Sequence, residues 1–176
     1  MTLQELDAAI RRVQDFPKPG IRFYDITSVL TNPAAFGYCV DQLTEQVRAS
    51  GTGAVAAIEA RGFIFASVIA YRLNLPLILV RKKGKLPNAC RSQSFDLEYG
   101  SDIICVQEVD LVPGRRIHII DDLIATGGTL SAACKIFEGA GLVVSGISAC
   151  IGLPFLGYPE VLAPRPVKTL INFDSE

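Results

Sequence analysis

Two adjacent carboxylates followed by a glycine-rich turn are the strongest chemical signal in this sequence. Asp121 and Asp122 follow the apolar run Arg116–Ile120, and the segment Ala125–Thr129 then reads ATGGT. The two glycines let the backbone approach a ligand closely. Amides at the start of a helix, together with the two threonine hydroxyls, form a cradle for phosphate. The carboxylates suit a ligand rich in hydroxyl groups or a hydrated Mg²⁺. The stretch predicts a ribose 5-phosphate site, and the alternative is a strand–turn–helix with an acidic cap.

Cations follow two other predicted strands. The segment Arg81–Lys85 reads RKKGK after the predicted strand Pro76–Val80, and Arg61 comes shortly after the predicted strand Ala54–Ile58. Taken alone, the basic segment would be a solvated charged loop. Since ligands of parallel sheets bind at the carboxyl ends of strands, three such strand ends predict one site for a multiply charged phosphate.

Two other motifs carry less weight. Gly51–Ala56 matches G-x-G-x-x-A, but it precedes a strand, whereas a dinucleotide fingerprint follows one, so it indicates an ordinary turn. No phosphate-binding P-loop motif occurs. The single histidine, His118, lies within the apolar run and has no second ligand type at metal-binding spacing, which favours a structural histidine.

The composition indicates one globular domain. The chain has 176 residues, of which 49% are hydrophobic and 20% charged, and its net charge is −1. This balance argues against nucleic acid or an anionic membrane as a partner. No apolar run is long enough to span a bilayer, and the amphipathic N-terminus carries acids, unlike a signal peptide. Five cysteines, an odd number without a C-x-x-C pair, favour reduced thiols and a cytoplasmic location.

Hydrophobic periodicity predicts an α/β fold, with a parallel sheet flanked by helices. Helices are expected at 3–13, 33–49, 62–73 and 129–140, and strands at 54–58, 76–80, 116–120, 143–151 and 167–171. Segments 95–99 and 102–107 alternate like a hairpin that turns near Gly100. Segment 15–27 is expected to be a loop because of Pro17, Pro19 and Gly20, and segment 81–94 shows no apolar period.

Four stretches resemble the type I phosphoribosyltransferases, and most closely their adenine-using branch. DDLIATGGT resembles the family's motif for phosphoribosyl pyrophosphate (PRPP), and DFPKPGIRFYDIT, IEARGFIF, and RKKGKLP followed by FDLEYGSD match the adenine branch in order. The resemblance implies a single domain over residues 1–176. Within it, residues 1–32 would form a small hood over the base site, and residues 81–107 a flexible catalytic loop and β-hairpin.

The resemblance also implies an activity. The enzyme would transfer the 5-phosphoribosyl group from PRPP to adenine in purine salvage, giving AMP and pyrophosphate. It would use Mg²⁺, held mainly by PRPP and also through Asp121 and Asp122, and act as a cytoplasmic homodimer in which Arg81 reaches across to the partner. Two alternatives remain: a transferase for 6-oxopurines or xanthine, and a PRPP-sensing regulator without turnover. The second would be expected to carry a DNA-binding domain or a basic face.

The resemblance assigns a role to each matching position. Glu98 would be the catalytic general acid/base, with Tyr99 beside it on the mobile loop. The 5-phosphate would be bound by Ala125, Thr126, Gly127, Gly128 and Thr129, and the ribose by Asp121 and Asp122. Pyrophosphate would face Arg61, Arg81, Lys82 and Lys85, and the base would lie among Arg22, Phe23, Tyr24 and Leu153. A cis peptide bond is expected at Glu59-Ala60.

The sequence departs from the family pattern at two places. Relatives commonly have an aliphatic residue at Arg22 and an arginine at Tyr24, but base recognition there is expected to rely largely on the backbone. In the tail, Gly152-Leu153 replaces the usual Glu-Leu pair and Gly157-Tyr158-Pro159 replaces Gly-Gly-Arg. These changes are expected to alter the rim of the base pocket or the dimer edge.

Overall fold

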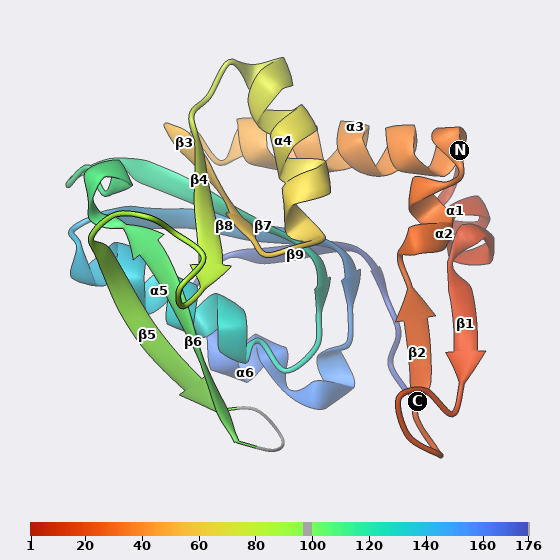
Figure 1. The fold of residues 1–176 in the computed structure, drawn as a ribbon. Coiled ribbons are helices and arrows are strands. Elements are labelled where there is room, and N and C mark those ends of the chain that lie inside the picture. The colour runs from red at the N-terminus through yellow and green to blue at the C-terminus, as the bar shows by residue number, and fades with distance from the viewer. Residues whose placement is uncertain (97–99, 176) are drawn as a thin grey trace.

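A mostly parallel sheet forms the centre of the molecule. The computed structural model describes residues 1–96 and 100–175. Within these residues the sheet has seven strands in the order β5-β6-β4-β3-β7-β8-β9 (Figure 1). Their bounds are β3 Ala54–Ile58, β4 Leu77–Lys82, β5 Cys90–Asp96, β6 Ser101–Gln107, β7 Arg116–Ile124, β8 Val143–Gly152 and β9 Val167–Asn172. Strands β5 and β6 pair antiparallel with each other, β6 pairs antiparallel with β4, and the other neighbours are parallel. The predicted fold class is therefore confirmed.

Helices cover both faces of the sheet, as the buried strand β3 requires. All five residues of β3 are buried, and its alternate side chains enter two different hydrophobic clusters. One cluster includes α3 (Pro33–Ala49) and α4 (Gly62–Leu73), which lie above the sheet in Figure 1. The other includes α5 (Gly128–Gly139) and α6 (Tyr158–Leu162), which lie below it. Strands buried on both faces read as continuous apolar runs, which is why this sheet was visible in the sequence.

The N-terminal segment forms a small separate layer beside the sheet. It contains α1 (Leu3–Ala9), β1 (Arg11–Gln14), β2 (Arg22–Asp25) and α2 (Thr27–Leu30), and β1 pairs antiparallel with β2. The expected helix 3–13 was wrong at its end, because the helix stops at Ala9 and Val13 pairs with Phe23 instead. The expected loop 15–27 was likewise too long, since its second half supplies the partner strand β2.

Other predicted elements agree with the structure, with differences at their ends. Helices 33–49 and 62–73 and strand 54–58 have the expected bounds. The strands β5 and β6 pair antiparallel as expected of a hairpin, but β5 spans Cys90–Asp96, mostly inside the segment that showed no apolar period. Residues 97–99 of the expected first strand lie outside the described residues. Two short elements near the C-terminus, the 3-10 turn Pro154–Leu156 and α6, were not predicted, and neither was the 3-10 turn Glu108–Asp110. No helix in the described part of the chain is long and apolar enough to cross a membrane.

Candidate active site

Three neighbouring cavities share one lining residue. Two lie at the carboxyl ends of β3, β4 and β7, and the third is lined mainly by the N-terminal layer. Their volumes are about 280, 210 and 530 Å³, and Arg61 lines all three. Arg61 lies in the short loop between β3 and α4, which contains the expected cis peptide bond Glu59-Ala60. Gly62 lets this loop approach β7, because a Cβ there would lie 2.8 Å from the carbonyl oxygen of Ile120. We call these spaces the acidic, turn and hood cavities.

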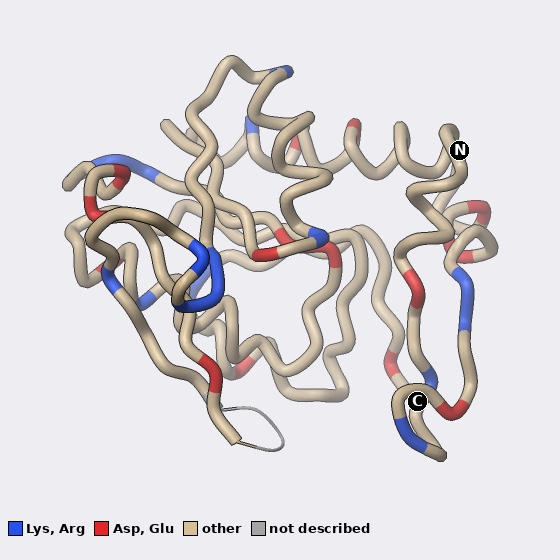
Figure 2. The backbone as a smooth tube through the Cα atoms, in the orientation of Figure 1, with Lys and Arg blue, Asp and Glu red and all other residues tan. Residues whose placement is uncertain are grey.

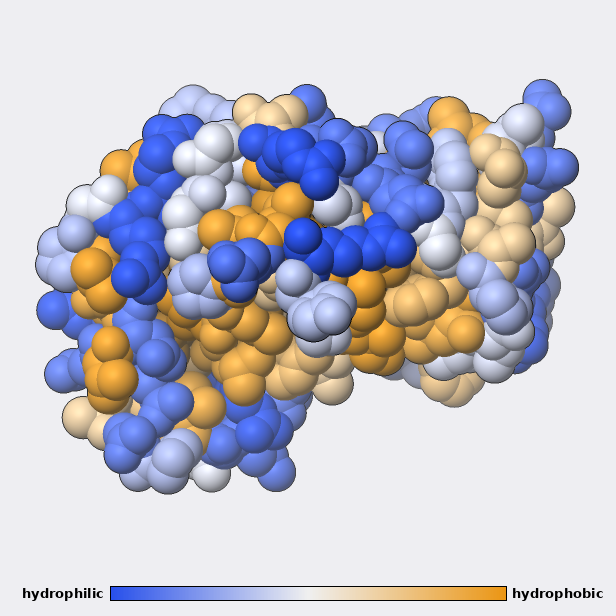
Figure 3. Space-filling view, turned by 90° about the horizontal axis from the view of Figure 1, so that it is seen from above, coloured by the Kyte–Doolittle hydropathy of each residue, from blue (hydrophilic) through white to orange (hydrophobic). Residues whose placement is uncertain are grey.

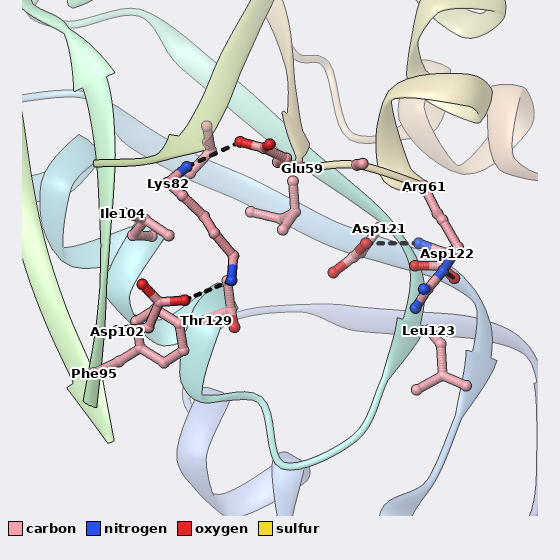
Figure 4. Close-up of a pocket in the computed structure, with 13 residues that line it drawn as sticks. Glu59, Arg61, Lys82, Phe95, Asp102, Ile104, Asp121, Asp122, Leu123 and Thr129 are labelled. Atoms are coloured by element: carbon pink, nitrogen blue, oxygen red, sulfur yellow. Dashed lines mark hydrogen bonds and ion pairs between the residues drawn. The ribbon is translucent and has the colours of Figure 1, made fainter. Parts of the chain in front are cut away.

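Arg61 and the two aspartates form the charged centre of the acidic cavity (Figure 4). The Arg61 Nε donates to Asp122 Oδ2 at 2.5 Å, and the Asp122 side chain is only 6% exposed. Although burial opposes it, this hydrogen bond raises the pKa of the Arg61 guanidinium. Asp121 Oδ1 accepts the backbone N–H of Asp122 at 2.9 Å. Burial, and then the nearby charge of Asp122, raise the pKa of Asp121 well above its usual range.

The two acids lie inside β7, whereas the sequence pattern suggested that they follow it. β7 continues to Ile124, four residues beyond the expected end at Ile120. Successive side chains of a strand point to opposite faces, so the neighbours meet different partners. Asp122 forms an ion pair with Arg61, whereas the negative charge of Asp121 has no direct ion pair with a cation in the described part of the chain.

The glycine-rich turn lines the second cavity with all five of its expected residues, Ala125 to Thr129. Gly127 adopts a φ of +79° and is the N-cap of α5, which begins at Gly128. A Cβ at Gly127 would lie 3.1 Å from Tyr158 Cβ and 3.2 Å from Leu162 Cγ. Glycine is therefore required here both by the backbone angle and by the packing of α6 against the turn.

The basic segment Arg81–Lys85 begins in the last two residues of β4, and Figure 2 shows it as a blue stretch of the backbone. It contributes one cation, Lys82, to the lining of the acidic cavity. Lys82 Nζ contacts Asp102 Oδ2 at 2.8 Å, and this hydrogen bond raises the pKa of Lys82. Arg81 instead donates to both carboxylate oxygens of Glu59, at 3.2 and 3.3 Å, and to the carbonyl of Lys85. Although burial opposes the shift, these bonds and that from the Lys82 amide lower the pKa of Glu59. Arg81 and Lys85 lie outside the lining of the three cavities.

The hood cavity has aromatic walls. Phe23 lines it together with Phe16, and the two rings meet edge to face with centroids 5.0 Å apart. Tyr24, the next residue of β2, points away and stacks on Phe173 with a centroid distance of 4.0 Å. Leu153 is buried at the end of β8, where its N–H donates to Ile124, and it does not line this cavity. Of the expected base residues, Arg22 is half-buried on β2, also outside this lining.

Several residues that line the cavities were missed by the sequence reasoning. They are Val13, Phe16, Asp25, Ile26 and Thr27 of the hood cavity, and Glu59, Phe95 and Asp102 of the acidic cavity. Phe16 belongs to the same short segment, DFPKPGIRFYDIT, as Phe23. The position of both aromatic residues in this segment is the sequence signal for Phe16. The expected catalytic residues Glu98 and Tyr99 lie outside the described residues, but the flanking hairpin residues Phe95 and Asp102 reach the cavity.

The two tail departures are linked in space. A Cβ at Gly152 would lie 2.3 Å from Asn172 Oδ1 and 2.7 Å from the Tyr158 hydroxyl oxygen. Tyr158 donates to Asn172 Oδ1 at 3.3 Å, and Thr169 donates to the same oxygen at 2.7 Å. A side chain at position 152 would collide with this network, so the glycine and the tyrosine belong to one arrangement.

The metal chemistry of the site is limited by its ligands. Among the described residues no group of three or more histidine, cysteine or acidic side chains could hold a metal ion. Asp121 and Asp122 supply two carboxylates, and Arg61 already occupies one of them. These donors therefore fit a cation whose other ligands are the oxygens of a bound phosphate compound.

The class of this protein follows from the fold, the turn and a family comparison. Residues 27–151 match the family model of the phosphoribosyl transferase domain. This match covers the sheet from β3 to β8 and every strand end that carries the site. The chain belongs to the phosphoribosyltransferase family.

Individual relatives narrow the class. The adenine phosphoribosyltransferase of Treponema denticola is 57% identical over 97% of this chain and 90% of its own length. That of Chloroflexus aurantiacus is 45% identical over 98% of this chain and all of its own. The crystal structure of the Thermoanaerobacter pseudethanolicus enzyme of the same name has a TM-score of 0.93 at 41% identity, covering 98% of this chain and all of that one. Within the family, the chain groups with the adenine phosphoribosyltransferases, as its motifs predicted.

Proposed function

We propose that this protein transfers the 5-phosphoribosyl group of PRPP to adenine and releases AMP and pyrophosphate. The observation that carries the proposal is the position of Arg61 at the meeting point of three chemically different cavities. A turn rich in amides, a charged centre and an aromatic wall suit the phosphate, the ribosyl pyrophosphate and the base, respectively. The related enzyme of Saccharomyces cerevisiae, 32% identical over 96% of this chain with a TM-score of 0.91, was crystallised with an imino-altritol bisphosphate and adenine.

The turn and the two aspartates would hold the sugar phosphate. Amides of residues 125–129 and the start of α5 would donate to the 5-phosphate, with the hydroxyls of Thr126 and Thr129 as further donors. Asp121, the less compensated acid, would accept hydrogen bonds from the ribose hydroxyls. Asp122 would orient Arg61 and contact the same ribose edge.

The cations would stabilise the departing pyrophosphate. As the bond at C1 breaks, positive charge develops on the sugar and negative charge on the leaving group. Arg61 and Lys82 already face the acidic cavity, and preorganised cations are most effective where charge develops. Arg81 and Lys85 would join them by exchanging their present contacts with Glu59 and the backbone for the ligand, or by reaching a partner subunit.

The base would bind in the hood cavity against Phe23 and Phe16. Stacking on Phe23 suits any purine, so the choice of adenine would rest on backbone donors and acceptors of the hood. Arg22 and Tyr24 would contribute through their main chain, since the Tyr24 side chain packs on Phe173. Leu153 would support the far side of the base from the end of β8.

Glu98 would handle the proton of the purine, with Tyr99 beside it. A positioned carboxylate can exchange a proton with N7 or N9 as N9 bonds to C1. Closure of the hairpin over the cavity would exclude water, which would otherwise intercept the sugar.

Mg²⁺ would be bound mainly by the phosphate oxygens of PRPP, with Asp121 and Asp122 on its outer side. When bound, the ion neutralises charge on the pyrophosphate and helps to orient it. Binding of this dication would also compensate the buried charge of the aspartate pair.

A homodimer in the cytoplasm completes the proposal. The upper face of the molecule exposes hydrophobic residues between hydrophilic ones (Figure 3). Among the exposed large side chains, Ile64 (38% exposed) and Tyr71 (87% exposed) belong to α4. Such a face suits burial against a second copy. Sedimentation equilibrium would measure the mass, and a monomer at working concentration would contradict this part.

One assay tests the activity. Purified protein with Mg²⁺ and PRPP is incubated with adenine, hypoxanthine, guanine or xanthine in turn, and nucleotide formation is measured. We expect AMP from adenine at a rate several orders of magnitude above the others, because a mismatched buried donor or acceptor is costly. Absence of AMP would refute the proposal, and efficient turnover of a 6-oxopurine would favour the alternative transferase.

A further inference from the structure

A fourth cavity lies at the opposite edge of the sheet from the active site. It has a volume of about 200 Å³ and is formed by the end of α3 and the first residues of β7, β8 and β9. Its polar lining residues are Gln46, Ser50, His118, Ser145 and Lys168. Figure 1 draws the first residues of β7, β8 and β9 at the ends away from their arrowheads, whereas the acidic and turn cavities are lined in part by the last residues of β3, β4 and β7.

Two buried polar atoms of this cavity have no hydrogen-bond partner in the described part of the chain. They are His118 Nδ1 and Gln46 Oε1. His118 is only 3% exposed, and its other ring nitrogen, Nε2, is 2.9 Å from Ser148 Oγ. A buried polar atom without a partner costs on the order of 1–3 kcal/mol. Two such atoms on one cavity point to a ligand that supplies the missing partners.

The backbone leaves room for the imidazole at this point. A Cβ at Gly146 would lie 2.7 Å from His118 Cε1 and 2.8 Å from Nδ1. The pairing of β7 with β8 also shifts register between Ile117 and His118. Any other residue at position 146 would displace the imidazole ring. Glycine at this position therefore allows His118 to occupy its place beside the cavity.

The charge around the cavity is positive. Lys168 is the only charged residue in its lining, and none of the lining residues is acidic. Just outside, the Arg116 guanidinium donates to the carbonyls of Ser50 at 3.0 Å and Gly51 at 3.1 Å. The hydroxyls of Ser50 and Ser145 also line the cavity, where they donate to the carbonyls of Val47 at 2.7 Å and Ile117 at 3.0 Å. In the tautomer with hydrogen on Nδ1, His118 donates to the ligand, and only Gln46 Oε1 requires a donor from it.

We propose that this cavity binds a small oxyanion that also carries a hydrogen-bond donor, the class to which hydrogen phosphate belongs. The anionic oxygens would face Lys168 and His118 Nδ1, and the ligand O–H would donate to Gln46 Oε1. The space exceeds that of one water molecule, which takes about 30 Å³ in the liquid, so it accommodates an ion of several atoms.

Binding should be linked to the protonation of His118. Burial, and then the charge of Lys168, lower the pKa of His118 to about 4. Among the described residues, Lys168 on β9 is the one whose charge acts on the His118 ring. The other residues around the ring, Gln46 on α3, Val55 on β3 and Ser148 on β8, are neutral. An anion beside the imidazole would offset both effects and raise the pKa of His118. The affinity should therefore increase as the pH falls toward that pKa.

The single histidine allows a direct test. The full chain, labelled with ¹⁵N at histidine, is titrated with inorganic phosphate and followed by NMR, with chloride at equal ionic strength as the reference. We expect a saturable shift of the His118 ring signals and an increase in its pKa. Lys168→Met should weaken this response about tenfold or more, a loss of about 1.4 kcal/mol. Lys83→Met, a change at an exposed lysine outside the cavity, should leave the response intact.

Three results would overturn the proposal. One is the absence of any phosphate-specific shift of the ring signals. Another is an equal shift in the Lys168→Met variant, which would mean that phosphate acts from the glycine-rich turn. The third is a high-resolution crystal structure, grown in phosphate, in which water alone fills the cavity.

Discussion

Asp121 and Asp122 are neighbours in sequence, yet their environments differ. Asp122 is bound by the Arg61 guanidinium at 2.5 Å, whereas Asp121 is half-buried beside another carboxylate and has a raised pKa. The pair is thus a stored electrostatic cost, which a ribose and its metal would relieve on binding. Buried acids of this kind cluster at functional sites because binding requires their charge.

Asp121→Asn should stabilise the folded protein at neutral and alkaline pH. The folded-state pKa lies above the unfolded value, so wild type is destabilised above the folded pKa and recovers as the pH falls through it. Asparagine keeps the acceptor for the Asp122 amide and carries no charge. A gain of about 1 kcal/mol would raise Tm by about 2–4 °C.

Thermal unfolding of both proteins across a pH series would check this sign. The advantage of the variant should shrink as the acid is titrated, while its KM for PRPP should rise. Asp174→Asn, a change at an exposed acid, should have neither effect. A variant that is less stable than wild type at alkaline pH would show that Asp121 is stabilised as the anion.

Glu98→Gln should reduce turnover while leaving PRPP binding nearly unchanged. Loss of a positioned proton-transfer group lowers rates by about 10²-fold or more, and glutamine keeps the shape of the side chain. Steady-state kinetics and equilibrium binding of PRPP separate the two effects. The matched control is Glu108→Gln, at an exposed glutamate, and unchanged kcat in Glu98→Gln would remove this residue from the mechanism.

At the scale of elements, the glycine-rich turn depends on a helix that the sequence pattern did not reveal. The short helix α6 places Tyr158 and Leu162 within 3.1 and 3.2 Å of the position that a Cβ on Gly127 would occupy. Tyr158 is in turn tied through Asn172 to the last strand. The glycine-rich turn is therefore packed against α6, which contains Tyr158 of the expected tail departure.

Gly127→Ala should weaken PRPP binding, and Gly157→Ala is its matched control. Both glycines have φ near +80°, but no atom lies within 4 Å of a Cβ at Gly157. Both changes should cost about 1–2 kcal/mol of stability through the left-handed backbone. Only Gly127→Ala also displaces the turn, so we expect its KM for PRPP alone to rise by about tenfold. Equal KM values in the two variants would contradict the packing argument.

At the scale of the whole molecule, the two ends of the chain meet at the hood. Phe173, just after β9, stacks on Tyr24 of β2 with an interplanar angle of 6°. The Arg12 guanidinium lies 5.1 Å from the Phe173 ring centroid and 6.0 Å from that of Tyr24. This cluster fixes β2, whose opposite side presents Phe23 to the hood cavity. The C-terminal segment thus positions the proposed base site.

Phe173→Ala should therefore raise the KM for adenine more than the KM for PRPP. An aromatic pair contributes about 0.5–1.5 kcal/mol beyond its buried area, which corresponds to a change of about twofold to tenfold. Val109→Ala, at a hydrophobic residue that is 72% exposed, should leave both constants near wild type. Equal increases in both KM values would indicate a general loss of structure.

The sequence by itself determined the sheet, its flanking helices and the glycine-rich turn. These follow from local information, because apolar periodicity and glycine spacing are written in consecutive residues. It also indicated the strand-end cations, since parallel strands bring their carboxyl ends together. It did not reveal β1 and β2, in which Val13 pairs with Phe23 across a proline-rich loop, and it did not reveal α6.

Only the tertiary structure decided which charges meet. It paired Arg61 with Asp122 across 61 positions and Arg81 with Glu59 across 22, and it turned Tyr24 away from the cavity that Phe23 lines. It also placed His118 and Gln46 on one cavity, where His118 Nδ1 and Gln46 Oε1 have no hydrogen-bond partner in the described part of the chain. The physical reason is that hydrogen bonds and ion pairs between distant residues depend on packing geometry, which no local pattern of residues records.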